Sequence, residues 1–340
     1  MGQNLNLADH EFNQALKMIE AEEIGQEEKV DMLMQIAMGI QQKPKSPGQI
    51  LNAVKLYEKA LELCPQSQIL TRARIEARKG TAYQAIPDTG TGFLFKAQAQ
   101  YEVALPVLIG SGLPEEVAEA EMNLGVVLQA LAGFQKIPIT ECISAYQRSL
   151  RVFERNKYPT EYAILHNNLA TAFLSIPMND ERAKMREALA VQSFEAALEV
   201  VNLVDHPSEY AMLQNNLGNA LQYASSSHPV ENNLRALEAY DESLKVRTRH
   251  DTPLEYANTI SNKANCLRNL PDNPENPGSG NHGRLMQARL LYREAQQIFA
   301  AYGELGKENV IKEVLQDIEQ DLGTSQAGSR GGKGFGEERV

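Results

Sequence analysis

Two stretches of the sequence that otherwise look helical each carry a doubled asparagine. The pairs are Asn167 and Asn168 in NNLATAFLSI (167–176), and Asn215 and Asn216 in NNLGNALQYA (215–224). Asparagine is a mediocre helix former, because its side-chain amide competes for nearby backbone groups. A carboxamide is both donor and acceptor, so it can pair with the carbonyl and the N–H of a peptide bond at once. The pairs therefore suggest helices that hold another polypeptide.

Internal repeats define the elements that position these amides. A small residue recurs in QIAMGIQ, RKGTAYQ, NLGVVLQ, NLATAFL, NLGNALQ and NKANCLR, at spacings of 43, 45, 45, 48 and 46 residues. These small anchors are Ala37, Gly80, Gly125, Ala170, Gly218 and Ala264. Each anchor is followed by an aromatic residue three positions before another small one, as in Tyr101 and Ala104. Residues three apart share one helix face, so the pattern predicts six units of two helices.

The expected helix boundaries agree with this repeat. A proline stands just before each of four first helices, at Pro114, Pro159, Pro207 and Pro253. Thr160 and Ser208 are good N-cap residue types, and the early glutamates favour the positive end of a helix. The sequence shows no alternating strand pattern of convincing length. We therefore predict an all-α fold.

The pattern resembles the tetratricopeptide repeat, in which a small residue lies midway along the first helix and an aromatic and a small residue lie on the second. The resemblance covers about residues 27–304. The usual period is about 34 residues, whereas the spacing here is 43 to 48 residues. The chain is most similar to the long bacterial repeats found beside caspase-like peptidase domains. This resemblance implies a right-handed α-solenoid of antiparallel helix pairs with a concave inner face.

The two ends of the chain fit a solenoid, whose terminal faces need covers. We expect an N-terminal capping helix within residues 1–26, six repeats over 27–304 and a C-terminal capping helix over 305–322. Residues 323–340 are rich in glycine and polar residues, so we expect a disordered tail there.

In tetratricopeptide proteins the first helices line the concave groove, and the residue two before the small anchor usually faces it. Four consecutive repeats have asparagine at this position, namely Asn123, Asn168, Asn216 and Asn262. The resemblance implies that this asparagine row holds the backbone of a partner peptide. Further candidate groove residues are Arg78, Gln129, Asn167, Asn215, Asn219, Gln222, Asn265 and Arg268. The alternative is that these amides tie neighbouring first helices together, and the two roles are compatible.

Basic side chains flank the asparagine row at Arg74, Arg78, Lys263 and Arg268. They could bind acidic residues or a terminal carboxylate of a partner, and simple surface solvation is the alternative. The net charge of −11 argues against general nucleic-acid binding, which needs a basic surface. No apolar run approaches the roughly 18 residues that span a bilayer, and the first residues lack a signal-peptide pattern. We therefore expect a cytoplasmic protein that does not bind membranes.

No set of residues points to catalysis. The six histidines lack metal-ligand spacing, and the three cysteines fit reduced core thiols better than disulfides. The stretch GSRGGKGF has no Ser or Thr after Lys333 and no strand before it, so it is not a phosphate-binding loop. We expect neither an enzyme nor a bound metal or cofactor.

Two functions remain open. The first is a scaffold or adaptor that binds a peptide segment of a partner protein in the groove. The alternative is a regulatory or sensor subunit of a separately encoded enzyme, such as a caspase-like peptidase, which binds by its outer face or its tail. A helical-repeat RNA binder is disfavoured by the charge, and the sequence predicts no oligomeric state.

Overall fold

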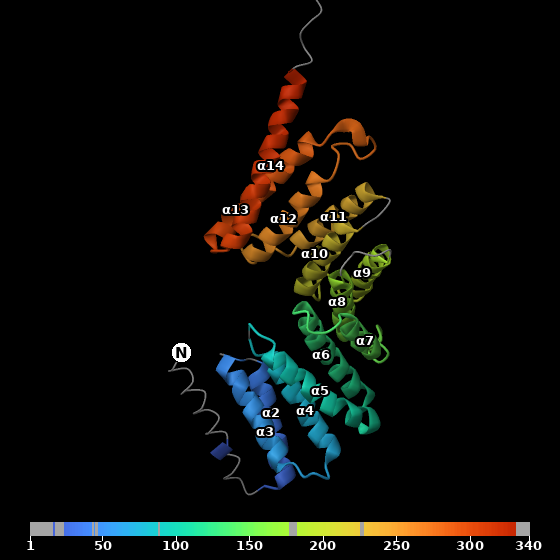
Figure 1. The fold of residues 1–340 in the computed structure, drawn as a ribbon, viewed down its shortest axis with the longest axis vertical. Coiled ribbons are helices and arrows are strands. Elements are labelled where there is room, and N and C mark those ends of the chain that lie inside the picture. Colours follow the sequence, from blue (N-terminus) through green and yellow to red (C-terminus); the bar gives the residue numbers. More distant parts are fainter. Residues whose placement is uncertain are drawn as a thin grey trace, which may run out of the picture. The chain divides into compact units, whose positions relative to one another are not determined.

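The computed structural model describes residues 16–17, 24–42, 44, 47–87, 89–176, 182–224 and 228–330. Every regular element among these residues is helical, and none of them lies in a β-strand (Figure 1). The chain divides into two compact units, Met1–Ile176 and Pro177–Val340. Within each unit the helices pack mainly on their neighbours in sequence, which confirms the predicted α-solenoid. The right-handed winding of the whole array stays a prediction.

Unit 1 contains the helices of repeats one to three and the first helix of repeat four. They are α2 (Gln26–Gln42), α3 (Pro47–Leu63), α4 (Ile69–Gln84), α5 (Gly92–Ser111), α6 (Pro114–Gly133), α7 (Thr140–Ser149) and α8 (Pro159–Ser175). The first helices also contact each other across repeat boundaries, α2 with α4, α4 with α6, and α6 with α8. Successive first helices therefore form one continuous layer of this unit.

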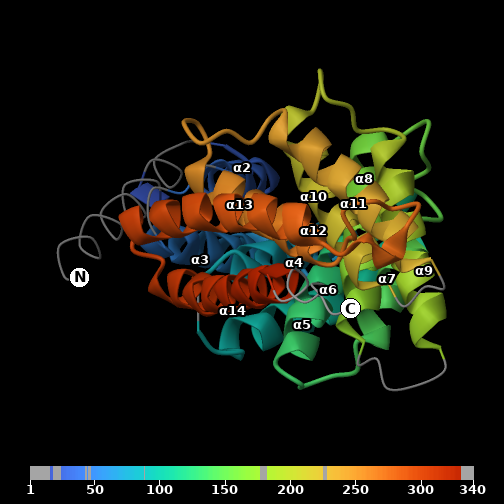
Figure 2. The same ribbon diagram turned by 90° about the horizontal axis from the view of Figure 1, so that it is seen from above.

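Unit 2 contains the second helix of repeat four, the pairs of repeats five and six, and a final helix. They are α9 (Ala183–Leu198), α10 (Pro207–Tyr223), α11 (Pro229–Leu244), α12 (Pro253–Arg268), η1 (Pro277–Ser279), α13 (His282–Ala301) and α14 (Leu305–Arg330). The final helix α14 packs on α13 (Figures 1 and 2).

The two predicted terminal segments differ in how far the structure describes them. Helix α14 passes the expected end at residue 322 and continues to Arg330. The stretch GTSQAGSR contains no proline, and its two glycines lower helix propensity without stopping a helix. Residues 331–340 of the predicted tail, and almost all of the predicted N-terminal helix, lie outside the described residues.

The prolines take the first positions of their helices instead of preceding them. Pro159 and Pro207 begin α8 and α10, so Thr160 and Ser208 lie inside the first turn and are not the N-caps. The N-caps are Tyr158 and His206, and neither makes a side-chain capping hydrogen bond. Proline suits the first helical position because its φ angle is already helical and the N–H it lacks has no partner there.

The small anchors give space to the aromatic rings of the second helices. A Cβ atom at Gly125 would lie 2.4 Å from the ring of Tyr146, and one at Gly218 would lie 2.6 Å from the ring of Tyr240. Both tyrosines are fully buried. The recurring small residue therefore exists because the ring of the second helix rests directly on the backbone of the first.

Candidate functional site

Buried tyrosines of the second helices donate hydrogen bonds to amides of the first helices. Tyr57 donates to Oε1 of Gln41 at 2.6 Å, and Tyr146 donates to Oε1 of Gln129 at 2.8 Å. Burial raises the pKa of Tyr57 to about 12 and raises that of Tyr146 further, so both hydroxyls keep their protons. Gln129, a predicted groove residue, thus binds inside its own repeat.

The same contact in repeat five uses two predicted groove residues. The hydroxyl of Tyr240 lies 2.7 Å from Oδ1 of Asn219 and 2.9 Å from Oε1 of Gln222. A hydroxyl has one hydrogen, so it donates to one of these two amide oxygens at a time or shares its hydrogen between them. The other polar atom of Gln222 is enclosed, with no hydrogen-bond partner among the described residues. Asn219 and Gln222 therefore serve the packing of Tyr240.

Other predicted residues tie neighbouring first helices together. In unit 2, Asn262 donates to Oδ1 of Asn215 at 3.2 Å, and Asn265 donates to the hydroxyl of Tyr223 at 2.9 Å. Both bonds join α10 to α12. In unit 1, the amide nitrogen of Gln129 donates to Oγ1 of Thr171 at 3.0 Å and joins α6 to α8. For these residues the structure shows the inter-repeat contact that was the alternative to partner binding.

The rest of the asparagine row keeps hydrogen-bonding capacity in unit 1. Asn123 is partly exposed on α6, and its side chain bonds to no other residue that the structure describes. Asn168 accepts a hydrogen bond from Asn167 at 3.3 Å, while its own amide nitrogen donates to none of the described residues. Asn216 is partly buried on α10. Because the row spans both units, its action as one line stays a prediction.

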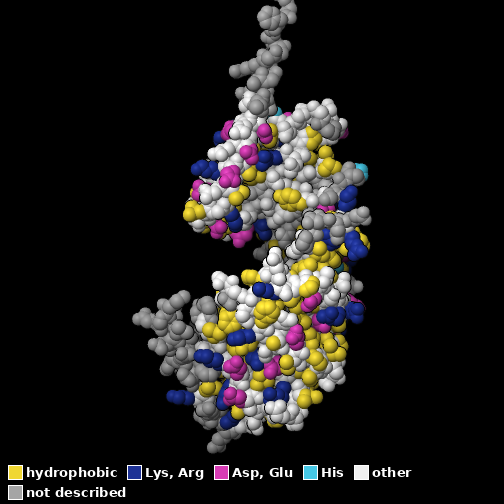
Figure 3. Space-filling model, viewed as in Figure 1, with side chains coloured by type: hydrophobic (Ala, Val, Ile, Leu, Met, Phe, Trp, Pro, Cys, Tyr) yellow, Lys and Arg dark blue, Asp and Glu magenta, His cyan; other side chains and the backbone are white. Residues whose placement is uncertain are grey.

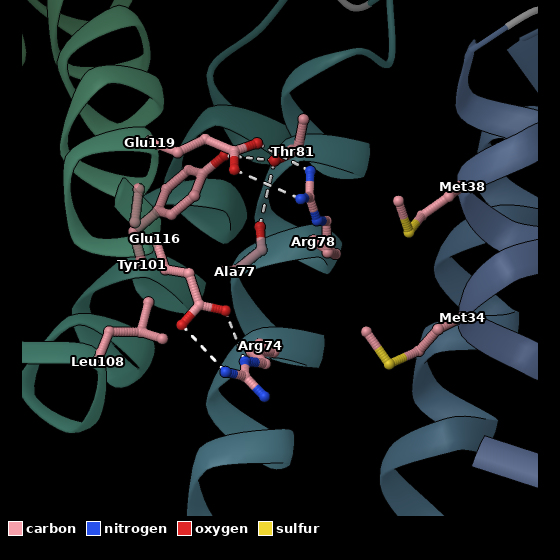
Figure 4. Close-up of a pocket in the computed structure, with 11 residues that line it drawn as sticks. Met34, Met38, Arg74, Ala77, Arg78, Thr81, Tyr101, Leu108, Glu116 and Glu119 are labelled. Atoms are coloured by element: carbon pink, nitrogen blue, oxygen red, sulfur yellow. Dashed lines mark hydrogen bonds and ion pairs between the residues drawn. The ribbon is translucent and has the colours of Figure 1, made fainter. Parts of the chain in front are cut away.

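A pocket of about 170 Å³ opens on the first helices of unit 1. We call it the first-helix pocket, and its main lining residues are Met34 and Met38 of α2, Arg74, Ala77 and Arg78 of α4, and Glu116 and Glu119 of α6. Both methionines extend from α2 toward α4, and the arginines lie between them and the glutamates (Figure 4). The pocket thus combines a flexible apolar wall with charged groups of both signs.

Two ion pairs cross from α4 to α6 at this pocket. Arg74 contacts the carboxylate of Glu116 at 2.6 and 3.1 Å, and Arg78 contacts that of Glu119 at 2.8 and 3.4 Å. The hydrogen bond from Arg74 holds the pKa of Glu116 below its usual range, so this carboxylate is ionised at neutral pH. The side chains of Arg74 and Arg78 remain 41% and 37% exposed. Arg78 therefore has an acidic partner within its own chain but is still accessible.

The other predicted cations also have partners within the chain. Lys263 forms an ion pair with Asp241. Burial raises the pKa of Tyr292 to about 12, and Arg268, which hydrogen-bonds to this tyrosine, opposes the rise. A preference for acidic partners, predicted from these cations, is thus reduced by the acidic groups already paired with Arg78 and Lys263.

Sequence reasoning missed four residues of the first-helix pocket, Met34, Met38, Glu116 and Glu119. A signal for them was present. Met34 and Met38 are four residues apart, as are Arg74 and Arg78, so each pair shares one helix face. The repeat pattern drew attention to amide and basic side chains, and so the methionines and glutamates were not predicted as site residues.

The features that would indicate other classes of protein are sparse in the described part of the chain. No group of three or more His, Cys, Asp or Glu residues there is placed to hold a metal ion. None of the described helices is long and apolar enough to cross a membrane. The three cysteines are free and buried, as predicted. Burial raises the pKa of Cys142 to about 11 and that of Cys266 to about 12, which keeps both thiols protonated.

The described residues thus form a helical repeat protein with a pocket on the first helices of unit 1. No model of a known protein family matches the sequence, and a search of curated proteins finds no match. Among solved structures, the chain is similar to a Rap protein complexed with competence and sporulation factor. The two share 13% sequence identity with a TM-score of 0.43, over 87% of this chain and 76% of that one.

Proposed function

We propose that this chain is a non-catalytic scaffold or adaptor that binds an extended peptide segment of a partner protein along its first helices. The observation that carries this proposal is the first-helix pocket. Its methionines adapt to apolar side chains of different shape, because the thioether side chain is unbranched and flexible. A guanidinium has five donors, so Arg74 and Arg78 retain donors beyond those that bind Glu116 and Glu119.

The amides of unit 1 supply the contacts to the peptide backbone in this proposal. Asn123 lies on α6, which also carries Glu116 and Glu119 of the first-helix pocket. Its carboxamide, which bonds to none of the described residues, can accept from one N–H and donate to one carbonyl of a bound strand. The amide nitrogen of Asn168 on α8 donates to none of the described residues and can serve the same purpose. Peptide binding therefore rests on Asn123 and Asn168, while the amides of unit 2 mainly hold the repeats together.

The test is a selection of binding peptides from a displayed library of random sequences, with the full-length chain as target. Selected peptides are then titrated against Met38→Lys and Asn123→Ala variants. We expect Met38→Lys to weaken binding at least about tenfold, because it places a charge against an apolar anchor. Asn123→Ala removes one or two hydrogen bonds and should weaken binding about fivefold.

Met32→Lys is the matched control, since Met32 lies on the same helix, is 37% exposed and does not line the pocket. Peptide affinity should be unchanged in this variant. Selected peptides that bind Met38→Lys and the wild type equally would contradict the proposal. A lower melting temperature in Asn123→Ala with unchanged affinity would assign this asparagine to structure.

A specific feature also supports the regulatory alternative. The solvent-exposed side of α5 carries Phe95, Val103 and Ile109, which are 44%, 61% and 65% exposed. The exposed positions of α3 instead hold Lys55 and Glu58. Figure 3 shows many hydrophobic side chains on the visible surface of unit 1. A subunit that docks on an enzyme by this side would lose its partner in Val103→Glu/Ile109→Glu and keep it in Met38→Lys.

A further inference from the structure

We infer that the first-helix pocket binds the C-terminal segment of a second copy of this chain, through Phe335, Glu337 and Arg339. The C-terminal segment is residues 331–340, GGKGFGEERV, which follow helix α14. This inference rests on the proposed function, because it names the peptide that occupies the same pocket.

The chemistry of the pocket changes in a fixed order across the first helices (Figure 4). Helix α2 contributes the apolar pair Met34 and Met38, α4 the basic pair Arg74 and Arg78, and α6 the acidic pair Glu116 and Glu119. Packed helices lie about 8–10 Å apart. A complementary ligand therefore presents an apolar, then an acidic, then a basic group, the last two close together because the arginines and glutamates are paired.

The C-terminal segment has these groups in this order. Phe335, Glu337 and Arg339 occupy alternate positions. In an extended chain alternate side chains lie on one side, about 6.6–6.8 Å apart along the strand. Phe335 can then contact the methionines while Glu337 meets the arginines and Arg339 meets the glutamates. Gly334 and Gly336 stand on either side of Phe335 and add no side chain that would hinder a close approach.

The ion pairs of the pocket need not break when the segment binds. Arg74 uses its Nε and Nη2 atoms on Glu116, which leaves Nη1 for Glu337. A carboxylate offers about four acceptor positions, so Glu116 and Glu119 can each accept from Arg339 as well. The four charges of the pocket and the two of the segment would then alternate in sign and stabilise one another. An acidic ligand without the basic residue would instead add negative charge beside Glu116 and Glu119.

This contact is made between the first-helix pocket of one molecule and the C-terminal segment of another. The contact joins different surfaces of the two molecules, so it is heterologous and can extend to a ring or an open chain. Association should therefore increase with protein concentration. If a molecule bound its own segment instead, the pocket would be filled at every concentration.

The first experiment titrates a dye-labelled synthetic peptide GGKGFGEERV with full-length Phe335→Ala protein, whose own segment cannot compete. We expect saturable binding by fluorescence anisotropy. A peptide with Phe335→Ala should bind at least about tenfold more weakly, because a buried phenylalanine side chain is lost. A Glu337→Arg peptide should also bind more weakly, since its charge then faces Arg74 and Arg78. Met38→Lys in the protein should reduce binding, and Met32→Lys should not.

The second experiment is sedimentation velocity over a concentration series of the full-length chain. The wild type should associate as concentration rises, Phe335→Ala should stay monomeric, and free peptide should dissociate the wild type. Peptide binding that survives both Phe335→Ala and Met38→Lys would overturn the inference. A wild type that stays monomeric at all concentrations would also overturn the inference. This holds even if the wild type binds the peptide more weakly than the Phe335→Ala protein does, because each molecule would then bind its own segment.

The library selection separates this inference from the proposed function. If library peptides bind in a Met38-dependent manner and GGKGFGEERV does not bind, the segment is not the ligand and the scaffold function stands. If neither binds, both proposals fail.

Discussion

At the scale of single residues, the contact between a ring and a backbone explains the most regular feature of the sequence. The rings of Tyr101, Tyr146 and Tyr240 lie against Gly80, Gly125 and Gly218. The hydroxyl on each of these rings also needs a polar partner, because a buried O–H without one is costly. Repeat four has phenylalanine at the aromatic position, Phe194, and leucine where Gln129 stands in repeat three, Leu174. Repeat four thus lacks both the ring hydroxyl and the amide that would accept a hydrogen bond from it.

Substitution of Gly125 tests this contact. A Cβ atom there would lie 2.4 Å from the Tyr146 ring, so the ring or the helix must move. We expect Gly125→Ala to lower the free energy of unfolding by about 1–3 kcal/mol, as overpacked cores do. Gly133→Ala in the same helix is the control, since no described atom beyond the chain neighbours and the helix's own backbone lies within 4 Å of the added methyl group. It should be neutral or raise stability by up to about 1 kcal/mol. Urea unfolding measures both, and equal effects would contradict the packing argument.

At the scale of elements, a side chain from the loop before α13 caps that helix. Asp272 accepts hydrogen bonds from the N–H groups of Gly283 at 3.0 Å and Arg284 at 2.8 Å, in the first turn of α13. The loop is closed by a bond from the N–H of Asp272 to the carbonyl of Gly280 at 2.7 Å. The long insertion of repeat six is therefore tied to the helix that follows it.

Asp272→Ala should destabilise the chain by about 0.5–2 kcal/mol at neutral pH, as the loss of a helix cap does. The bond from the Gly283 N–H holds the pKa of Asp272 below its ordinary value. The stabilisation is therefore present above pH about 4, the ordinary aspartate pKa, and is lost as the pH falls through the lowered pKa. Urea unfolding of wild type and variant should give a difference that shrinks with acidification.

Glu275→Ala is the control for this prediction, because Glu275 lies in the same loop and its side chain bonds to no described residue. Its substitution should leave stability unchanged at both ends of the pH range. A difference between Asp272→Ala and wild type that persists undiminished at low pH would show that the carboxylate charge is not involved.

The sequence was sufficient to predict the helix pairs. It was insufficient to predict which positions of neighbouring repeats contact each other. Spacing and small anchors predicted all six pairs, because each repeat must bury its own aromatic ring. The two ion pairs between α4 and α6, however, join positions about one turn apart in the repeat. Arg78 is two residues before its anchor, and its partner Glu119 is six before the next. This offset depends on how side chains of adjacent helices interdigitate, so comparing equal positions did not bring Arg78 and Glu119 together.

At the scale of the whole molecule, the polar contacts between repeats that the described residues make join only neighbouring repeats. Arg74 and Arg78 join α4 to α6, Gln129 joins α6 to α8, and Asn262 and Asn265 join α12 to α10. In such an array stability is approximately a sum of repeat terms and nearest-neighbour interface terms. A destabilising substitution in one repeat should then lower the stability of the adjoining repeats and have little effect on repeats further away.

The glycine anchors of the two units allow this to be measured. Gly218→Ala in unit 2 places a Cβ atom 2.6 Å from the Tyr240 ring, a lesion of the same kind as Gly125→Ala in unit 1. Because the two positions share no contact partner, their effects on unfolding free energy should add to within about 0.5 kcal/mol in the double variant. Native-state hydrogen exchange should show faster exchange in α6 and α7 for Gly125→Ala, and in α10 and α11 for Gly218→Ala. If either variant instead accelerated exchange uniformly along the chain, the repeats would unfold as one cooperative block, and nearest-neighbour coupling would not describe this solenoid.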